Sequence, residues 1–173
     1  MFNWIKTGRV AWIFDDNFVP DDMIAGANLN DEDPDRLKAL VMQTYVSNFA
    51  EDVQDGDFFV GKKNYGYGRA HEGVTVVMQA MGIGGIIADS FVLEYGTRSA
   101  NKGYPLILEC PGISENVDRW DLLEVDFKNG TVKNLTKEQT LQGLPTPEDL
   151  AEMIELGGQE PLLRRYVQET QGL

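Results

Sequence analysis

One segment of this chain concentrates side chains that could do chemistry. Residues 58–72 read FFVGKKNYGYGRAHE and contain three glycines, the chain's one histidine, His71, and Arg69 two residues before it. An imidazole can exchange a proton near neutral pH, and a guanidinium can bind a carboxylate through two parallel hydrogen bonds. Glycines let backbone N–H groups approach an anion. The pattern is typical of an anion-binding loop, although glycines also occur in a strand-to-helix turn for steric reasons alone.

The elements around this loop predict an α/β fold. An apolar strand precedes the loop at 58–60, and apolar residues at helical spacing follow it from about 71 to 81. Further strands are predicted at 9–14, 83–88 and 104–108, with a helix between the last two that Asp89-Ser90 caps and that ends near Asn101. This alternation indicates a parallel or mixed sheet covered by helices.

Other start and turn signals complete the prediction. Asp33 can cap a helix with Pro34 at its first position, and the helix is expected to continue through Leu37, Leu40, Val41, Tyr45 and Phe49. Asn129-Gly130 joins two short strands as a β-hairpin. Helices are expected from Thr146-Pro147 to Gly157-Gly158, and again from Pro161 to Val167.

The totals exclude several classes of function. A length of 173 residues fits one domain, 1–173, and a formal net charge of −13 argues against binding to nucleic acid. No apolar run approaches the roughly 20 residues that a membrane helix needs. The first residues show no signal-peptide pattern, so we expect a cytoplasmic protein. The acidic stretch 15–35 reads as a solvated surface or as a docking surface for a basic partner.

The sequence offers few residues that could bind a metal or form a disulfide. Cys110 is the one cysteine, so the chain can form no internal disulfide and cannot by itself hold an iron–sulfur cluster or a Cys₄ zinc site. We expect Cys110 to be a small buried hydrophobe. The paired aspartates at 15–16 and 21–22 do not have the spacing of an EF-hand loop, so no metal site is expected.

Several motifs occur in one order along nearly the whole chain. They are Asp16-Asn17 with Asp21 beyond, Gly61 with Asn64-Tyr65-Gly66-Tyr67-Gly68, Glu72, Gly82-Ile83, Ile86-Ile87-Ala88-Asp89-Ser90-Phe91, Asn101 with Gly103 and Pro105, and the tail from Met153. In this order they resemble the small subunit of 3-isopropylmalate dehydratase. The resemblance implies a three-layer β/β/α swivelling barrel of the aconitase superfamily, with one swivel domain across 1–173.

The resemblance also implies a function and a partner. Such small subunits pair with a large subunit that carries a [4Fe–4S] cluster, and the complex dehydrates or isomerises a hydroxy di- or tricarboxylic acid. A 3-isopropylmalate-like or 2,3-dimethylmalate-like substrate is the expectation here. Residues of this chain that the resemblance places at the substrate are Asp16, Asn17, Asn64, Gly66, Tyr67, Gly68 and Arg98.

The chain departs from the family where the chemistry is done. Two family serines fall on Arg69 and Ala70, and the family arginine falls on His71. The first serine is the base in relatives, and an arginine cannot take that role at neutral pH. We therefore expect His71 to transfer the proton, Arg69 to bind a substrate carboxylate, and Tyr67 to donate to a developing oxyanion.

Further departures leave other functions open. The family Asp-Thr is Val19-Pro20 here, and an expected asparagine is Arg98. Since fold alone does not fix function, two alternatives remain. The chain could be a non-catalytic or regulatory subunit that kept the swivel fold, or a stand-alone domain that binds a small molecule.

Overall fold

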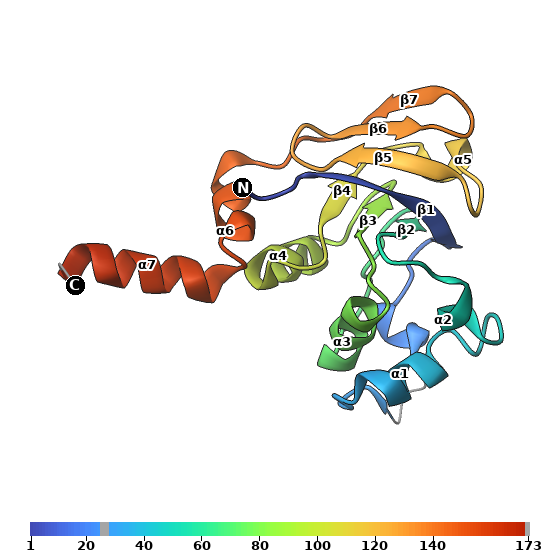
Figure 1. The fold of residues 1–173 in the computed structure, drawn as a ribbon, viewed down its shortest axis with the longest axis horizontal. Coiled ribbons are helices and arrows are strands. Elements are labelled where there is room, and N and C mark those ends of the chain that lie inside the picture. Colours follow the sequence, from blue (N-terminus) through green and yellow to red (C-terminus); the bar gives the residue numbers. More distant parts are fainter. Residues whose placement is uncertain (25–27, 172–173) are drawn as a thin grey trace.

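The computed structural model describes residues 1–24 and 28–171, and seven strands within them form one curled sheet (Figure 1). Across the sheet the strands are β4 (Ile107–Glu109), β3 (Gly85–Ala88), β2 (Phe58–Gly61), β1 (Ile5–Phe14), β5 (Leu122–Asp126), β6 (Thr131–Asn134) and β7 (Gln139–Gln142). Strands β1 to β4 are parallel, and β5 to β7 continue the sheet in antiparallel order. The predicted α/β class and the hairpin through Asn129-Gly130 are confirmed.

The long strand β1 joins the two parts of the sheet. Its first half, Ile5–Arg9, pairs with β5, and its second half pairs with β2, with a shift in register between Val10 and Trp12. An irregularity of this kind bends a strand and increases its twist. β1 can therefore take part in both the parallel and the antiparallel portions of one curled sheet.

Helices cover the sheet on both faces. They are η1 (Pro20–Met23), α1 (Pro34–Leu40), α2 (Phe49–Asp52), α3 (Glu72–Ala80), α4 (Leu93–Lys102), α5 (Ile113–Asn116), α6 (Glu148–Glu155) and α7 (Gln159–Gln171). Figure 1 shows α1 and α3 together on one side of the parallel strands, with α4 and α6 nearer to α7.

Two apolar clusters, one on each face, hold these layers together. Phe59 and Ile86 point into the cluster that contains the buried residues of α1 and α3. Their chain neighbours Phe58, Val60 and Ile87 point into the other cluster, which contains the hairpin and α6. Because successive strand residues face opposite sides, continuous apolar runs are what a sheet buried on both faces requires.

The helix predicted from Pro34 to Phe49 is shorter than the pattern suggests. It ends at Leu40, because Val41 turns to an extended conformation and Met42 adopts a left-handed one with φ 59°. The Met42 N–H donates to the Met23 carbonyl at 2.7 Å, and Val41 and Met42 are buried. Burial of these two side chains outweighs continuation of the helix, and a second short helix, α2, starts only at Phe49.

Two predicted caps serve other purposes. Helix α4 begins at Leu93 after an uncapped Val92, whereas Asp89 accepts from the Ser114 hydroxyl at 2.5 Å and Ser90 binds the loop described below. Thr146 donates to the Phe127 carbonyl at 2.7 Å in place of capping α6. The predicted stop of α4 is confirmed, since Gly103 follows it with φ 66°. Strand β7 was not predicted.

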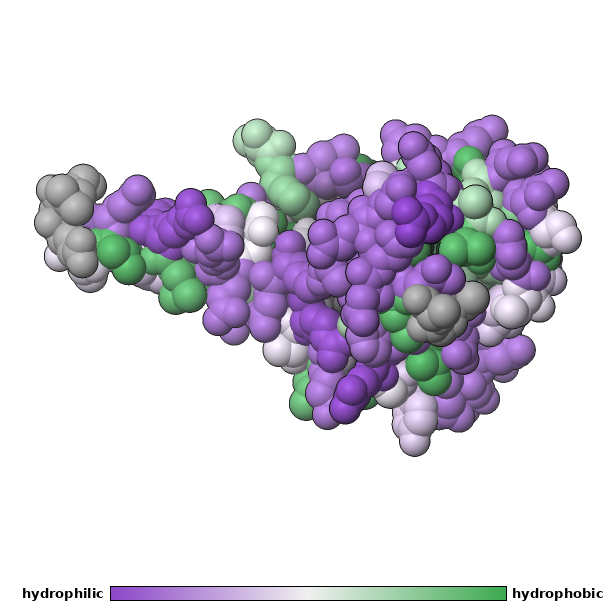
Figure 2. All heavy atoms as spheres, turned by 90° about the horizontal axis from the view of Figure 1, so that it is seen from below, coloured by the Kyte–Doolittle hydropathy of each residue, from purple (hydrophilic) through white to green (hydrophobic). Residues whose placement is uncertain are grey.

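The last helix, α7, projects from the body of the molecule (Figure 1). It carries the exposed apolar side chains Leu163, Tyr166 and Val167. Figure 2 shows apolar patches on this projecting end, whereas hydrophilic residues dominate the rest of that face. Among the helices of residues 1–24 and 28–171, none combines the length and apolar character needed to span a bilayer.

Candidate functional site

The loop singled out in the sequence lies at one edge of the parallel strands. Phe14, Gly61 and Ala88 are aligned across β1, β2 and β3, so these strands end side by side. In α/β sheets, ligands bind outside the carboxyl ends of the strands. The three loops that leave these ends span residues 15–19, 62–71 and 89–92.

Hydrogen bonds tie the first loop to the second. The Asn17 N–H donates to the Lys63 carbonyl at 2.8 Å, and the Lys63 N–H donates to Asp16 Oδ1 at 3.0 Å. The Asn64 amide donates to Asn17 Oδ1 at 2.9 Å. Both asparagines are left-handed, with φ 57° and 58°, a conformation that asparagine tolerates. The structure thus brings Asp16, Asn17 and Asn64 together, with their polar groups partly used to join the loops.

The third loop anchors the centre of the second. The Asn64 N–H donates to Ser90 Oγ at 2.9 Å, and the Tyr65 N–H donates to the Ser90 carbonyl at 3.0 Å. The Tyr65 side chain is fully buried, and burial raises its pKa well above the usual value. Its ring contacts those of Phe14, Phe18, Phe91 and Tyr95. The loop is therefore pinned by a buried aromatic side chain at its middle.

The two glycines after Tyr65 are required for different structural reasons. Gly66 has φ 89°, and a Cβ there would lie 2.4 Å from Tyr95. Gly68 has φ 75°, but its nearest neighbour, Val19, would be at an ordinary 3.6 Å. Gly66 is thus required by both conformation and space, and Gly68 by conformation alone.

The backbone beyond this turn presents N–H groups that are free of partners. Those of Gly66 and Tyr67 both donate to the Phe18 carbonyl, at 3.1 and 3.0 Å. Those of the next three residues, 68–70, form no hydrogen bond with any described part of the chain. Successive free N–H groups in such a turn can bind an anion. The anion site predicted for the loop is therefore best placed at 68–70.

His71 is held by an aspartate from outside the loop. The His71 N–H donates to Asp21 Oδ1 at 2.7 Å, and His71 Nδ1 lies 2.6 Å from Asp21 Oδ2. The Asp21 side chain is 13% exposed and that of His71 is 33% exposed. The imidazole therefore has one nitrogen engaged with a largely buried carboxylate while part of its ring stays accessible.

Two basic residues of α4 bind the backbone and side chain on either side of His71. Arg98 Nη1 donates to the Ala70 carbonyl at 2.9 Å. Lys102, one turn later, forms an ion pair with Glu72. Arg98, which the resemblance placed at the substrate, thus has one nitrogen committed to holding the loop.

The side chains of Arg69 and Tyr67 take no part in these contacts. Tyr67 is 56% exposed, and Arg69 is also exposed. Within the described ranges, neither side chain forms a hydrogen bond or an ion pair. Both are therefore available to a ligand at this edge of the sheet.

Residues 1–24 and 28–171 offer no group of three or more His, Cys, Asp or Glu side chains placed to hold a metal ion. Cys110 is fully buried, and burial together with the nearby Asp89 raises the pKa of its thiol to about 11. A thiol that keeps its proton is a poor metal ligand. The donor set described here does not fit an iron–sulfur cluster.

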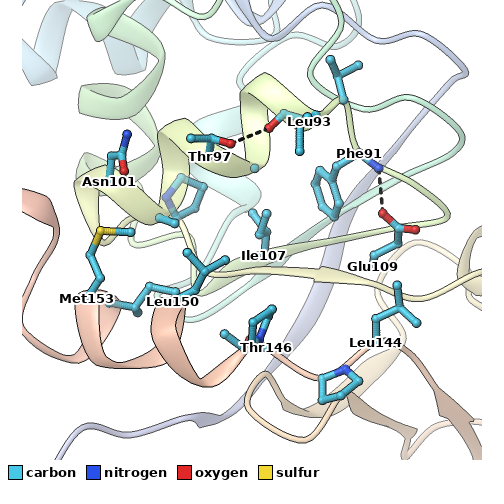
Figure 3. Close-up of a pocket in the computed structure, with 17 residues that line it drawn as sticks. Phe91, Leu93, Thr97, Asn101, Ile107, Glu109, Leu144, Thr146, Leu150 and Met153 are labelled. Carbon is cyan, nitrogen blue, oxygen red and sulfur yellow. Dashed lines mark hydrogen bonds between the residues drawn. The ribbon is translucent and has the colours of Figure 1, made fainter.

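An apolar groove lies beside this edge, between α4 and α6 (Figure 3). It encloses about 350 Å³ and is lined by Phe91, Leu93, Ile107, Leu144, Leu150 and Met153, among others. The Phe91 N–H and the Glu109 carboxylate, 3.4 Å apart, mark its end nearest the loops. None of the residues expected to bind substrate lines this groove.

Sequence reasoning missed two contributors to the loop cluster. The sequence pattern predicts a helix cap at Ser90, although its place directly after a buried strand is a signal for this edge of the sheet. Asp21 was noticed as part of a motif, but nothing in its spacing showed that it reaches residue 71.

Comparisons with known proteins give consistent matches, although no protein-family profile matches the chain. The small subunit of isopropylmalate/citramalate isomerase from Methanocaldococcus jannaschii is 38% identical over 167 residues, which are 96% of this chain and 98% of that protein. The 3-isopropylmalate dehydratase small subunit of Wolinella succinogenes is 38% identical over 154 residues, or 89% of this chain and 90% of that one. A crystal structure of 3-isopropylmalate dehydratase from Methanocaldococcus jannaschii superposes with a TM-score of 0.82 at 25% identity, and covers 96% of this chain and 99% of that one.

Proposed function

The chain belongs to the family of 3-isopropylmalate dehydratase small subunits, hydro-lyases of the aconitase superfamily, and we propose that it acts as the swivel-domain subunit of a dehydratase. Its expected substrate is a hydroxy di- or tricarboxylic acid, either 3-isopropylmalate-like or 2,3-dimethylmalate-like. The observation that carries the proposal is the cluster of loops at 15–19 and 62–71. There an accessible imidazole lies within residues 68–71 together with a guanidinium and backbone N–H groups that have no partner among the described residues.

Arg69 and the free N–H groups of 68–70 suit a substrate carboxylate. A guanidinium can bind both carboxylate oxygens, and backbone N–H groups add fixed donors without a loss of side-chain freedom. The exposed Arg69 has no acidic partner in the described part of the chain, so binding a substrate would not require breaking an ion pair. A largely acidic protein, of net charge −13, gains from having a free cation at the point where an anion must bind.

His71 is the candidate base. Its Nε2 forms no hydrogen bond with any described residue, and its side chain is one-third exposed. Nε2 would accept the proton from the carbon beside the substrate carboxylate. The electron pair of that C–H bond becomes the new C=C bond, and the hydroxyl on the neighbouring carbon leaves as hydroxide. The hydroxide and the abstracted proton together make up the water that is released. The Tyr67 hydroxyl can donate to the negative charge that develops on the carboxylate.

The group that accepts the leaving hydroxyl would lie on a second, large subunit. The single cysteine of this chain is buried and protonated, so an iron–sulfur cluster would need ligands from that partner. The cluster would supply the Lewis acid of the reaction, and this chain would supply the carboxylate site and the base.

A non-catalytic subunit is the second candidate function. The observation that favours it is Arg69 at the position of the family's serine base, because an arginine cannot accept a proton. In that case the chain would bind the large subunit and substrate without taking part in proton transfer. A stand-alone binding domain is the third candidate, and isolation of a stable complex with a large subunit would exclude it.

The test is turnover by the complex of this chain with a large subunit of the same family. Dehydration of 3-isopropylmalate and of 2,3-dimethylmalate would be followed by absorbance of the new double bond. We expect His71→Ala to lower kcat by about 10²- to 10⁴-fold. Arg69→Ala should chiefly raise KM, since it removes a charge-assisted contact to the carboxylate.

Lys63→Ala provides the matched control for the loss of positive charge. Lys63 lies in the same loop and is exposed, and its side chain forms no hydrogen bond or ion pair with the described residues. Its replacement should leave kcat and KM unchanged. Unchanged turnover in His71→Ala would remove the histidine from the mechanism, and an intact complex that dehydrates neither acid would favour the non-catalytic subunit.

A further inference from the structure

We propose that Asp21 is a positioning residue that keeps the proton of the neutral His71 ring on Nδ1, so that Nε2 remains the base. This inference rests on the proposed function for its catalytic meaning, but the tautomer itself can be measured on the chain alone. Asp21 belongs to η1, which follows the first loop, whereas His71 precedes α3. The contact therefore connects two elements that are 50 residues apart in sequence.

The two oxygens of Asp21 have separate partners. Oδ1 accepts from the His71 backbone N–H at 2.7 Å, and Oδ2 lies 2.6 Å from Nδ1 of the ring. An ionised carboxylate has no proton to give, so Nδ1 must be the donor in this contact. A neutral imidazole carries one proton, so Nε2 is then left with a free lone pair.

Asp21 holds the His71 ring, and α4 holds the chain on either side of it. The charged groups around it are Asp21 on η1, Glu72 at the start of α3, and Arg98 and Lys102 on α4. Arg98 holds the preceding carbonyl, and Lys102 holds Glu72. Among these four described residues, Asp21 alone forms a hydrogen bond with the imidazole. The backbone is held by α4 and the ring by Asp21, so Nε2 has a defined direction.

Asp21→Asn offers a sharp test, because the two oxygens of Asp21 contact different groups of His71, the backbone N–H and the ring Nδ1. The backbone N–H of His71 can only donate, so the asparagine carbonyl oxygen must face it. The asparagine NH₂ then faces Nδ1 and donates to it. Nδ1 becomes the acceptor, and the ring proton moves to Nε2. A nearly isosteric substitution is therefore expected to switch the tautomer.

The measurement is long-range ¹H–¹⁵N correlation NMR on the full chain, in a buffer in which the ring nitrogen shifts are those of a neutral imidazole. The chain has one histidine, so one pair of ring nitrogen signals is expected. The wild type should show a protonated Nδ1 and an unprotonated Nε2, and Asp21→Asn should show the reverse. Asp22→Asn is the matched control, because Asp22 is adjacent and exposed and its side chain forms no hydrogen bond or ion pair with a described residue.

A second variant guards against a folding defect. Asp21→Ala should leave both tautomers populated, and the backbone amide spectrum reports whether each variant is folded. A wild type with its proton on Nε2, or a folded Asp21→Asn with the wild-type tautomer, would overturn the inference.

Turnover by the complex separates this inference from the proposed function. Asp21→Asn should lower kcat by on the order of 10³- to 10⁴-fold with little change in KM, as expected when a catalytic imidazole has the wrong tautomer. Asp22→Asn should match the wild type. If the tautomer switches but neither Asp21→Asn nor His71→Ala affects turnover, Asp21 still sets the tautomer, and the role of His71 as base is overturned.

Discussion

At the scale of single residues, the side chains that hold the loops of the candidate site differ from those proposed to meet the ligand. Asp16, Asn17 and Asn64 form hydrogen bonds that join the first loop to the second, and the Tyr65 side chain is buried. The side chains that we propose to act on the substrate, Arg69 and His71, belong to the adjoining backbone. A side chain that must meet a ligand is thus placed beside side chains that keep the loop in one conformation, which is the arrangement that precise binding sites need.

Gly66 and Gly68 give a prediction at this scale. Gly66→Ala should lower the free energy of unfolding by about 3 kcal/mol, because the new methyl group meets the Tyr95 ring and the backbone keeps a positive φ. Gly68→Ala, the matched variant, should lower it by only about 1 kcal/mol, since it has the positive φ without the collision. Urea denaturation of both variants measures the difference, and equal losses would contradict the steric argument at Gly66.

At the scale of elements, α4 acts as a support for the loop. Its residues Arg98 and Lys102 lie one turn apart and bind Ala70 and Glu72, on either side of His71. Residues at i and i+4 share one face of a helix, so a single helix can hold two points of the loop. Sequence spacing alone marked Arg98 only as a departure from a family pattern.

Arg98→Ala should therefore loosen the loop more than it destabilises the fold. We expect faster amide hydrogen exchange at His71, whose N–H donates to Asp21, and a fall of only about 1 kcal/mol in the free energy of unfolding, as for one lost hydrogen bond. Glu94→Ala, an exposed change on the same helix, should alter neither. Unchanged exchange in Arg98→Ala would show that Asp21 and the other loops hold this segment without α4.

Much of this element structure could be predicted from apolar patterns and turn residues. The buried strands around Phe59 and Ile87, the hairpin at Asn129-Gly130 and the end of α4 at Gly103 follow from local signals. The break after Leu40 could not be predicted, because it depends on Met42 reaching the Met23 carbonyl and the core.

The same limit applied to the candidate site. The loop and its residue types were visible in the sequence, whereas the Asp21 contact to His71 arises only when η1 packs against the start of α3. Residues far apart along the chain, such as Asn64 and Ser90, meet because parallel strands end at one edge. Patterns of spacing do not report such contacts.

At the scale of the whole molecule, β1 ties the two portions of the sheet into one unit. Arg9 lies where β1 still pairs with β5, and its side chain forms an ion pair at 2.6 Å with the buried Asp57, just before β2. Asp57 also accepts from the backbone N–H groups of Arg9 and Gln54. Loss of the Arg9 side chain would leave the buried Asp57 carboxylate without its cation, so this pair links β1 to the start of β2.

The buried thiol of Cys110 predicts a pH dependence of global stability. Its pKa of about 11 in the folded chain exceeds the ordinary value of 9.0, so the unfolded state loses the proton first. The free energy of unfolding should therefore fall as the pH rises between 9 and 11, by about 2 kcal/mol from this group. Urea denaturation at several pH values should show a steeper decline for the wild type than for Cys110→Ala, and parallel declines would refute the assignment.

The separation of loop supports from reactive side chains has a consequence for how such a protein can change its activity. Positions 67, 69 and 71 could be randomised in a library while Asp16, Asn17, Asn64 and Ser90 are kept, because the contacts of these four residues do not use the side chains at the varied positions. New substrate preferences could then be selected without first repairing stability. The arrangement makes this edge of the sheet a suitable starting point for directed evolution.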